Sequence, residues 1–200
     1  MEITATILLS IAVVATAWSG YQAALWDGIQ SSDYTQASAA RTVAAQNNLE
    51  ANQNRIIDLS LVESYLDARA IGQIQLAEFY RSRMRDELKP AFDAWIILHP
   101  ETNFDAPRSP QYMPQYHLAA EERAAALNNA ADAQFKAGQE ANATSDTYVA
   151  TTLFFASVLF FAAISERFEF RLARISLLVL AALSLSVGIV VAFSQRVTWG

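Results

Sequence analysis

Two histidines and a nearby carboxylate are the residues whose types best suit metal chemistry. His117 and Glu121 stand four residues apart, about one turn of a helix, and His99 precedes them in the same segment. Imidazole and carboxylate groups bind Zn²⁺, so these three residues are weak candidates for a metal site. The ordinary three-ligand spacings of zinc sites are missing, however. We therefore expect no metal site and no other cofactor.

The remaining patterns of catalysis are also missing from the sequence. The chain contains no cysteine and no G-x-S-x-G, and no two of its glycines are closer than eight residues. Phosphate-binding loops need closely spaced glycines, and covalent catalysis needs an activated nucleophile. We expect that the protein is not an enzyme.

Three arginines, Arg81, Arg83 and Arg85, could instead bind an anion or lipid headgroups. Acidic residues are interleaved with them at Glu78, Asp86 and Glu87, which favours ordinary surface ion pairs. The whole middle region, 27–146, has ten Lys and Arg against seventeen Asp and Glu, a net charge of minus seven. Nucleic acid requires a basic surface, so we expect no nucleic-acid partner.

The elements that must position these residues are organised around three apolar segments. Residues 3–26, 147–165 and 175–195 carry no charge, and each is close to the ~20 residues needed to cross a bilayer. Lipid offers no hydrogen-bond partners, so such segments cross as helices. We predict transmembrane helices at 1–26, 147–165 and 175–195. No basic residue precedes the first, which favours retention of this segment over cleavage as a signal peptide.

The short loop 166–174 sets the expected orientation. It carries Arg167, Arg171 and Arg174, and basic loops remain in the cytoplasm. Residues 27–146 would then be extracytoplasmic. The opposite orientation stays open, because long domains can translocate regardless of charge.

The middle region predicts an all-helical hairpin or bundle. Residues 31–89 contain no proline and a single glycine, so helix is expected without a strong stop until Pro90. Pro90 can begin a new short helix, 90–98, within the reversal predicted over 90–117. Four of the five prolines lie in 99–117, which predicts an extended stretch there, pinned by Tyr112, Met113 and Tyr116. Two paths remain: the first helix is straight and the proline segment descends along it, or the chain folds back near 46–55. The fold class expected is an all-α membrane protein with three transmembrane helices and a long helical extramembrane domain.

Alanine-rich and asparagine-rich runs suggest how the helices pair. Counting from both membrane ends places "ASAARTVAA" (37–45) opposite "NNAADAQFKA" (128–137), in antiparallel register. Small side chains allow close approach, and facing amides can fix register. We predict an alanine-lined seam with an amide layer formed by four asparagines: Asn47, Asn48, Asn128 and Asn129. The alternative is that alanine and asparagine merely reflect helix composition.

Two apolar stripes cover residues 56–88 and require burial on more than one face. One consists of Ile56, Leu59, Val62, Leu66 and Ile74, and the other of Leu61, Tyr65, Ala68, Ile71, Leu76 and Phe79. Either the chain folds into a compact bundle or copies pack together, and a homo-oligomer is favoured. The 99–117 tip is an alternative site for a protein partner.

No ionisable residue lies inside the three apolar segments, which disfavours active transport. Small and hydroxyl residues do lie there, and they allow tight helix packing or could line a pore in an oligomer. They are Ala12, Thr16, Ser19, Gly20, Ser184 and Gly188.

Two short motifs complete the pattern: "WSGYQA" from Trp18 to Ala23, and "ERFEF" from Glu166 to Phe170. With one N-terminal span, a polar helical middle and a C-terminal pair of spans, the chain resembles a group of bacterial inner-membrane proteins of no known activity. The resemblance implies a bacterial inner-membrane setting. We expect a non-enzymatic, homo-oligomeric scaffold or sensor in contact with membrane lipids. The alternative is an oligomeric ion channel lined by the first transmembrane helix.

Overall fold

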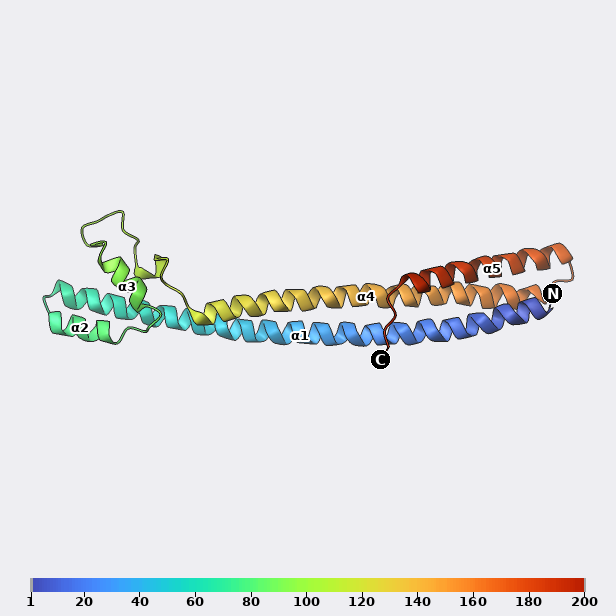
Figure 1. The fold of residues 1–200 in the computed structure, drawn as a ribbon, viewed down its shortest axis with the longest axis horizontal. Helices are drawn as coiled ribbons and strands as arrows, with labels where there is room; N and C mark the ends of the chain where they lie inside the picture. Colours follow the sequence, from blue (N-terminus) through green and yellow to red (C-terminus); the bar gives the residue numbers. More distant parts are fainter. Residues whose placement is uncertain (1, 200) are drawn as a thin grey trace. The chain divides into compact units, whose positions relative to one another are not determined.

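The computed structural model describes residues 2–199, in which every regular element is helical (Figure 1). The elements are α1 (Glu2–Ala70), α2 (Ile74–Ser82), α3 (Lys89–Ile96), the short 3-10 helix η1 (Pro110–Tyr112), α4 (Ala119–Ser165) and α5 (Arg171–Ser194). The all-α class predicted from the sequence is confirmed for these residues. Met1, part of the predicted first span, lies outside them.

The chain forms two compact units, and α1 and α4 contribute to both. Unit 1 contains residues 1–37 and 132–200, and unit 2 contains residues 38–131. Three helices are long and apolar enough to cross a membrane: α1, α4 and α5. Each of these helices contains one of the apolar segments predicted from the sequence, except that α5 ends at Ser194, one residue before the predicted end.

Unit 1 is held together by small residues that let the apolar helices pack closely. Ala12 of α1, Ala162 of α4 and Ala181 of α5 are buried in one cluster with Phe155. At Gly188 of α5, an added Cβ would lie only 2.6 Å from the Phe155 ring, so the missing side chain is what admits that ring. Gly138 of α4 admits the Tyr34 ring in the same way, again with 2.6 Å to an added Cβ.

The end of the chain returns to α1 and α4 inside unit 1. The Gln22 side chain is buried and makes two hydrogen bonds with the backbone of Thr198, donating to its carbonyl at 3.0 Å and accepting from its N–H at 3.1 Å. The Trp26 indole and the Tyr148 hydroxyl both donate to the Arg196 carbonyl, at 3.0 and 3.1 Å. One end of the three-helix unit is therefore tied by polar contacts. The connection between α4 and α5, residues 166–170, lies at the other end. It is shorter than the predicted loop 166–174, since α5 begins at Arg171 rather than at residue 175.

In unit 2, α1 ends much earlier than the sequence predicted. The N–H of Gln73 donates to the Ala68 carbonyl and the N–H of Gly72 donates to the Arg69 carbonyl, the pair of bonds of a Schellman C-cap. Gly72 has a φ of 76°, a left-handed conformation that glycine adopts without steric cost. The prediction of continuous helix to Lys89 is wrong, because this glycine is a C-cap. The alternative of a fold-back near 46–55 is also wrong, since α1 is helical throughout that range.

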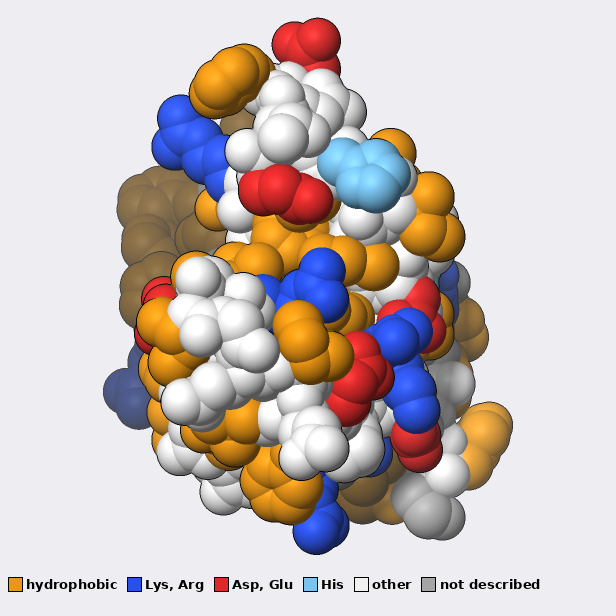
Figure 2. All heavy atoms as spheres, turned by 90° about the vertical axis from the view of Figure 1, so that its left-hand side faces the viewer, with side chains coloured by type: hydrophobic (Ala, Val, Ile, Leu, Met, Phe, Trp, Pro, Cys, Tyr) orange, Lys and Arg blue, Asp and Glu red, His pale blue; other side chains and the backbone are white. Residues whose placement is uncertain are grey.

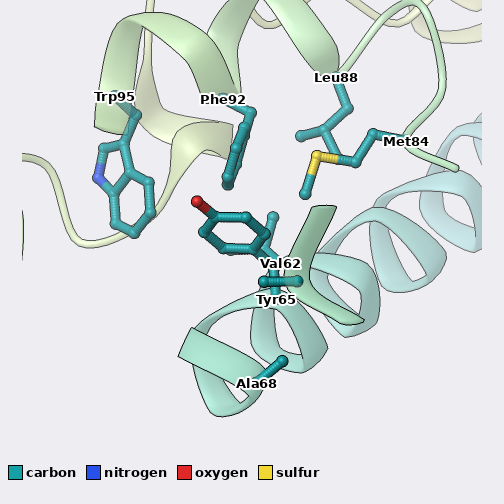
Figure 3. Close-up of a cluster of buried hydrophobic side chains, with 8 residues drawn as sticks. Val62, Tyr65, Ala68, Met84, Leu88, Phe92 and Trp95 are labelled. Carbon is teal, nitrogen blue, oxygen red and sulfur yellow. The ribbon is translucent and has the colours of Figure 1, made fainter. Parts of the chain in front are cut away.

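The reversal at Gly72 brings α2 and α3 onto one face of α1 (Figure 3). Tyr65 of α1 meets Phe92 of α3 edge-to-face, with ring centroids 4.9 Å apart, and Trp95 follows at 6.3 Å from Phe92. The cluster comprises Val62, Tyr65, Ala68, Ala77, Met84, Leu88, Phe92 and Trp95. A single chain thus buries part of each predicted stripe, namely Val62 of the first and Tyr65 and Ala68 of the second. The remaining exposed members are Ile56, Leu59, Leu66 and Ile74 of the first stripe and Ile71, Leu76 and Phe79 of the second.

The proline-rich segment packs along this core through a series of turns and the short helix η1, rather than in the extended form predicted. The Trp95 indole donates to the Pro107 carbonyl at 2.6 Å, and the Gln111 side chain donates to the Arg55 carbonyl at 2.7 Å. Met113 and Tyr116 pack against the buried cluster, as predicted. Tyr112 does not, because 72% of its surface is exposed. The predicted path in which this segment descends beside a straight helix is the one observed within unit 2.

The pairing of α1 with α4 in unit 2 is antiparallel and alanine-lined. Arg55 meets Glu121, and Arg123 meets Asn47 and Glu50, so residue numbers rise on one helix as they fall on the other. The buried residues between the helices include Ala44, Ala51, Ala120, Ala124 and Ala131. The alanine seam predicted for these runs is present.

Candidate functional site

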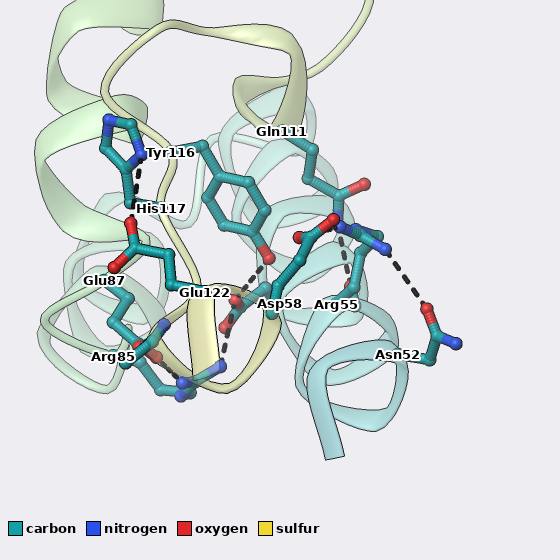
Figure 4. A network of polar contacts seen from close by, with 11 residues as sticks. Asn52, Arg55, Asp58, Arg85, Glu87, Gln111, Tyr116, His117 and Glu122 are labelled. Atoms are coloured by element: carbon teal, nitrogen blue, oxygen red, sulfur yellow. Dashed lines mark hydrogen bonds and ion pairs between the residues drawn. The ribbon is translucent and has the colours of Figure 1, made fainter. Parts of the chain in front are cut away.

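The polar feature that stands out in unit 2 is a buried carboxylate, Asp58 (Figure 4). It follows Ala44 and Ala51 at intervals of seven residues on α1 and precedes Tyr65 by the same interval. All four side chains are buried because they share the face of α1 that packs inside the unit. Asp58 is the one charged residue among these four.

Four side chains from three segments of the chain meet at this position. The Tyr116 hydroxyl donates to Oδ2 of Asp58 at 2.9 Å, and Nη1 of Arg85 donates to the same oxygen at 3.3 Å. Arg85 also pairs with Glu87, whose Oε1 accepts from the backbone N–H of Ala119 at 2.9 Å. We call Asp58, Arg85, Glu87 and Tyr116 the Asp58 latch. It links α1, the connection between α2 and α3, the end of the proline-rich segment and the start of α4.

Burial governs the electrostatics of the latch. Desolvation raises the pKa of Asp58, and the hydrogen bond from Tyr116 and the charge of Arg85 oppose this only in part. Burial and the neighbouring carboxylate raise the pKa of Tyr116, so its hydroxyl keeps its proton and remains a donor at neutral pH. Oδ1 of Asp58 is buried and has no hydrogen-bond partner. The latch therefore holds a carboxyl group whose ionised form is costly.

The geometry of the latch suits fastening rather than catalysis. Asp58 is 0% exposed, so a substrate cannot reach its carboxylate in this conformation. Its partners hold the proline-rich segment and the start of α4 against α1. The sequence analysis missed Asp58, although a signal was present: the seven-residue spacing from Ala44 and Ala51 places it on the buried face.

The metal-ligand candidates do not converge. His117 lies with Nδ1 3.7 Å from the carboxylate of Glu122, whereas Glu121 pairs with Arg55 at 2.7 Å. His99 lies 3.8 Å from Glu101 and has a φ of 49°, a left-handed conformation, in the turn that follows α3. Among residues 2–199, no group of three histidine, cysteine or acidic side chains could hold a metal ion.

The predicted amide layer is not formed. Asn48, Asn128 and Asn129 are exposed on their helices. Asn47 donates to the Val43 carbonyl at 2.9 Å and accepts from Nε of Arg123 at 3.2 Å. The register between the helices is close to the predicted one, but the rotation of each helix turns alanine rather than asparagine into the seam.

The small residues of the apolar helices differ in their surroundings. Ala12, Ser19 and Gly188 are buried inside unit 1, which fits the packing role. Thr16 bonds to the Ala12 carbonyl at 2.7 Å, and Ser184 is half-buried. Gly20 has nothing within 4 Å of an added Cβ, so no helix approaches it closely within the chain.

The three arginines near residue 83 have local partners. Arg81 donates to Oδ1 of Asp93 through Nη2 at 2.7 Å and through Nε at 3.2 Å, which joins α2 to α3. Arg83 stands 5.2 Å from the centre of the Phe79 ring, and Arg85 belongs to the latch. Seen from the end at which α2 lies, acidic, basic and hydrophobic side chains are interspersed (Figure 2). This face offers no large field of a single sign.

Comparison of the chain with protein-family models, with curated protein sequences and with solved structures gives no match.

Proposed function

We propose that the protein is a non-enzymatic, homo-oligomeric integral membrane protein of the bacterial inner membrane, in which unit 2 is an extracytoplasmic scaffold or sensor. Three apolar helices support the membrane location, and Arg167, Arg171 and Arg174 near the 166–170 connection support a cytoplasmic position for that end. Contact with membrane lipids follows from the same location.

The proposal of self-association is supported by a strip of exposed apolar residues on the part of α1 that belongs to unit 2. Leu49, Ile56, Leu59 and Leu66 follow one another at intervals of seven, three and seven, and all four are exposed. This spacing places them on one side of the helix, away from the buried series of Ala51, Asp58 and Tyr65. Exposed apolar side chains at coiled-coil spacing, outside the membrane-spanning part of a helix, are typical of a surface that pairs with another helix. A second copy of the same strip is the partner that this pattern fits.

The packing of unit 1 favours the scaffold over the ion channel. Ala12 and Ser19, two of the residues that would line a pore, are each 0% exposed within a single chain. They are occupied by contacts inside the protomer, so an oligomer could turn them to a central axis only by separating those helices.

Self-association can be tested with single cysteines, because the chain has none of its own. Ile56→Cys lies on the strip, and Ile57→Cys is a matched control, an isoleucine of similar exposure (51% against 68%) that lies one residue further round the helix. In membranes treated with a mild oxidant, we expect a disulfide-linked dimer of full-length Ile56→Cys and little dimer of Ile57→Cys. Equal yields for the two variants, or no dimer of either, would contradict the proposed interface.

A further inference from the structure

The exposed strip on α1 belongs to a longer seven-residue repeat. Counting in sevens from Leu49 and from Leu59 gives two interleaved series, which correspond to positions a and d of a coiled coil. The first series holds Leu49, Ile56, Glu63 and Ala70, and the second holds Ala45, Asn52, Leu59 and Leu66. All eight side chains are exposed, so the whole surface is open to a second helix.

The membrane fixes how two copies of this surface can meet. Every copy crosses the bilayer in the same direction, so a symmetric pair is related by a twofold axis along the membrane normal. The two α1 helices then run parallel, and each residue at position a or d faces the same residue of the second copy. A pair of asparagines, as at Asn52, is tolerated at such a position and can fix register. At Glu63, in contrast, two carboxylates face each other.

No positive charge within the chain offsets Glu63. It is the one ionisable residue among the eight positions. Among residues 2–199 its carboxylate has neither an ion-pair nor a hydrogen-bond partner. Asp67 stands one helical turn further along and adds a second negative charge. The nearest basic residue of α1, Arg69, is six residues away, a rise of about 9 Å.

Basic residues of the elements that pack on α1 in unit 2 have partners of their own. Arg81 of α2 pairs with Asp93 of α3, and Arg85 pairs with Asp58 on the buried face of α1. Arg123 of α4 pairs with Glu50. In a pair of chains, the carboxylates of Glu63 and Asp67 from both copies therefore meet without a basic partner.

We infer that the strip on α1 is an acid-sensitive dimer interface, which tightens when the facing Glu63 carboxylates take up a proton. Like charges that meet across an interface cost free energy, and a proton on either carboxylate removes the repulsion between the two. Dimer formation therefore takes up protons, so the dimer is favoured as the pH falls. This inference rests on the self-association proposed above, and it gives the proposed sensor a stimulus, protons on the extracytoplasmic side.

Energy transfer between full-length copies in lipid vesicles tests the inference. The chain has no cysteine, so Phe104→Cys provides a single exposed site for a donor or an acceptor dye in unit 2. Transfer is measured as the protein-to-lipid ratio is varied, which yields a dissociation constant at a pH of about 7.5 and of about 4.5. We expect the dissociation constant of this parent chain to be about ten-fold lower at the lower pH, the equivalent of about 1.4 kcal/mol.

Glu63→Gln in the same chain removes the charge and keeps the size of the side chain. At the higher pH we expect this variant to dimerise as tightly as the parent does at the lower pH, with little further change on acidification. Glu50→Gln is the matched control, an exposed glutamate of the same helix that lies off the strip, and it should behave like the parent.

Two results would overturn the inference and leave self-association in place. They are equal dissociation constants for Glu63→Gln and the parent at the higher pH, and a parent whose dissociation constant does not fall on acidification. Absence of energy transfer in every variant at both pH values would contradict self-association itself, and this inference with it.

Discussion

Replacing Asp58 with alanine is expected to destabilise unit 2 by about 3 kcal/mol, within the usual cost of breaking a buried ion pair. The substitution removes the acceptor of both Tyr116 and Arg85, and it leaves a cavity on the buried face of α1. Arg85 keeps its pairing with Glu87, which is why we expect the lower end of the range. Hydrogen exchange of the α3 amides in the full-length protein measures the effect. Asp67→Ala is the control, an exposed aspartate on the same helix, and should change the free energy by less than about 0.5 kcal/mol.

The pH dependence of the free energy of unfolding provides a second test of the role of Asp58. Because the pKa of Asp58 is raised by burial, the folded state favours the protonated carboxyl. The stability contributed by Asp58 is therefore fully present below its unfolded pKa of about 3.9 and is lost as the pH rises through the higher folded pKa. Asp58→Asn cannot titrate. We expect the free energy of unfolding of the Asn variant, relative to the parent, to improve as the pH is raised from about 4 to about 7. A relative stability that falls over this range would show that the carboxylate is stabilised in the folded state.

Replacing Phe92 with alanine is the second large change, expected to destabilise unit 2 by about 3 to 5 kcal/mol. Phe92 is 0% exposed and its ring pairs with those of Tyr65 and Trp95, so its removal leaves a cavity in the cluster of Figure 3. Loosening Trp95 also weakens its bond to the Pro107 carbonyl, which anchors the proline-rich segment.

Phe104→Ala is the matched control, because Phe104 is 101% exposed in the same unit. Exchange protection in α2 and α3 should fall in Phe92→Ala and stay unchanged in Phe104→Ala. Similar protection in both variants would mean that the cluster does not hold unit 2 together.

The sequence predicted the apolar helices and the alanine seam because each depends on a pattern repeated along the chain. Three uncharged segments of the right length require three helices in lipid, and alanine runs permit close pairing whatever the details of rotation. The asparagines failed as an amide layer because a count from the membrane ends fixes register but not rotation. A small rotation of the helix turns Asn128 and Asn129 to solvent and Ala131 to the seam.

The features that the sequence analysis missed depend on single residues. Gly72 ends α1 through its left-handed conformation, and a lone glycine in a helical pattern is also compatible with continued helix. Asp58 and Gln22 are buried polar residues whose partners are distant in the sequence, at Tyr116 and Thr198. No local sequence pattern predicts such distant partners. Only the seven-residue spacing of Ala44, Ala51 and Asp58 pointed toward the latch.

The central claim is that three helices cross the membrane with unit 2 on the extracytoplasmic side, and cysteine accessibility tests it most directly. Phe104→Cys places a thiol in unit 2, and Phe168→Cys places one in the 166–170 connection, where Phe168 is 45% exposed. Spheroplasts that express either full-length variant are treated with a membrane-impermeant maleimide before and after lysis. The account predicts that Cys at 104 is labelled in intact spheroplasts and that Cys at 168 is labelled only after lysis. Labelling of position 168 but not of position 104 in intact spheroplasts would contradict it.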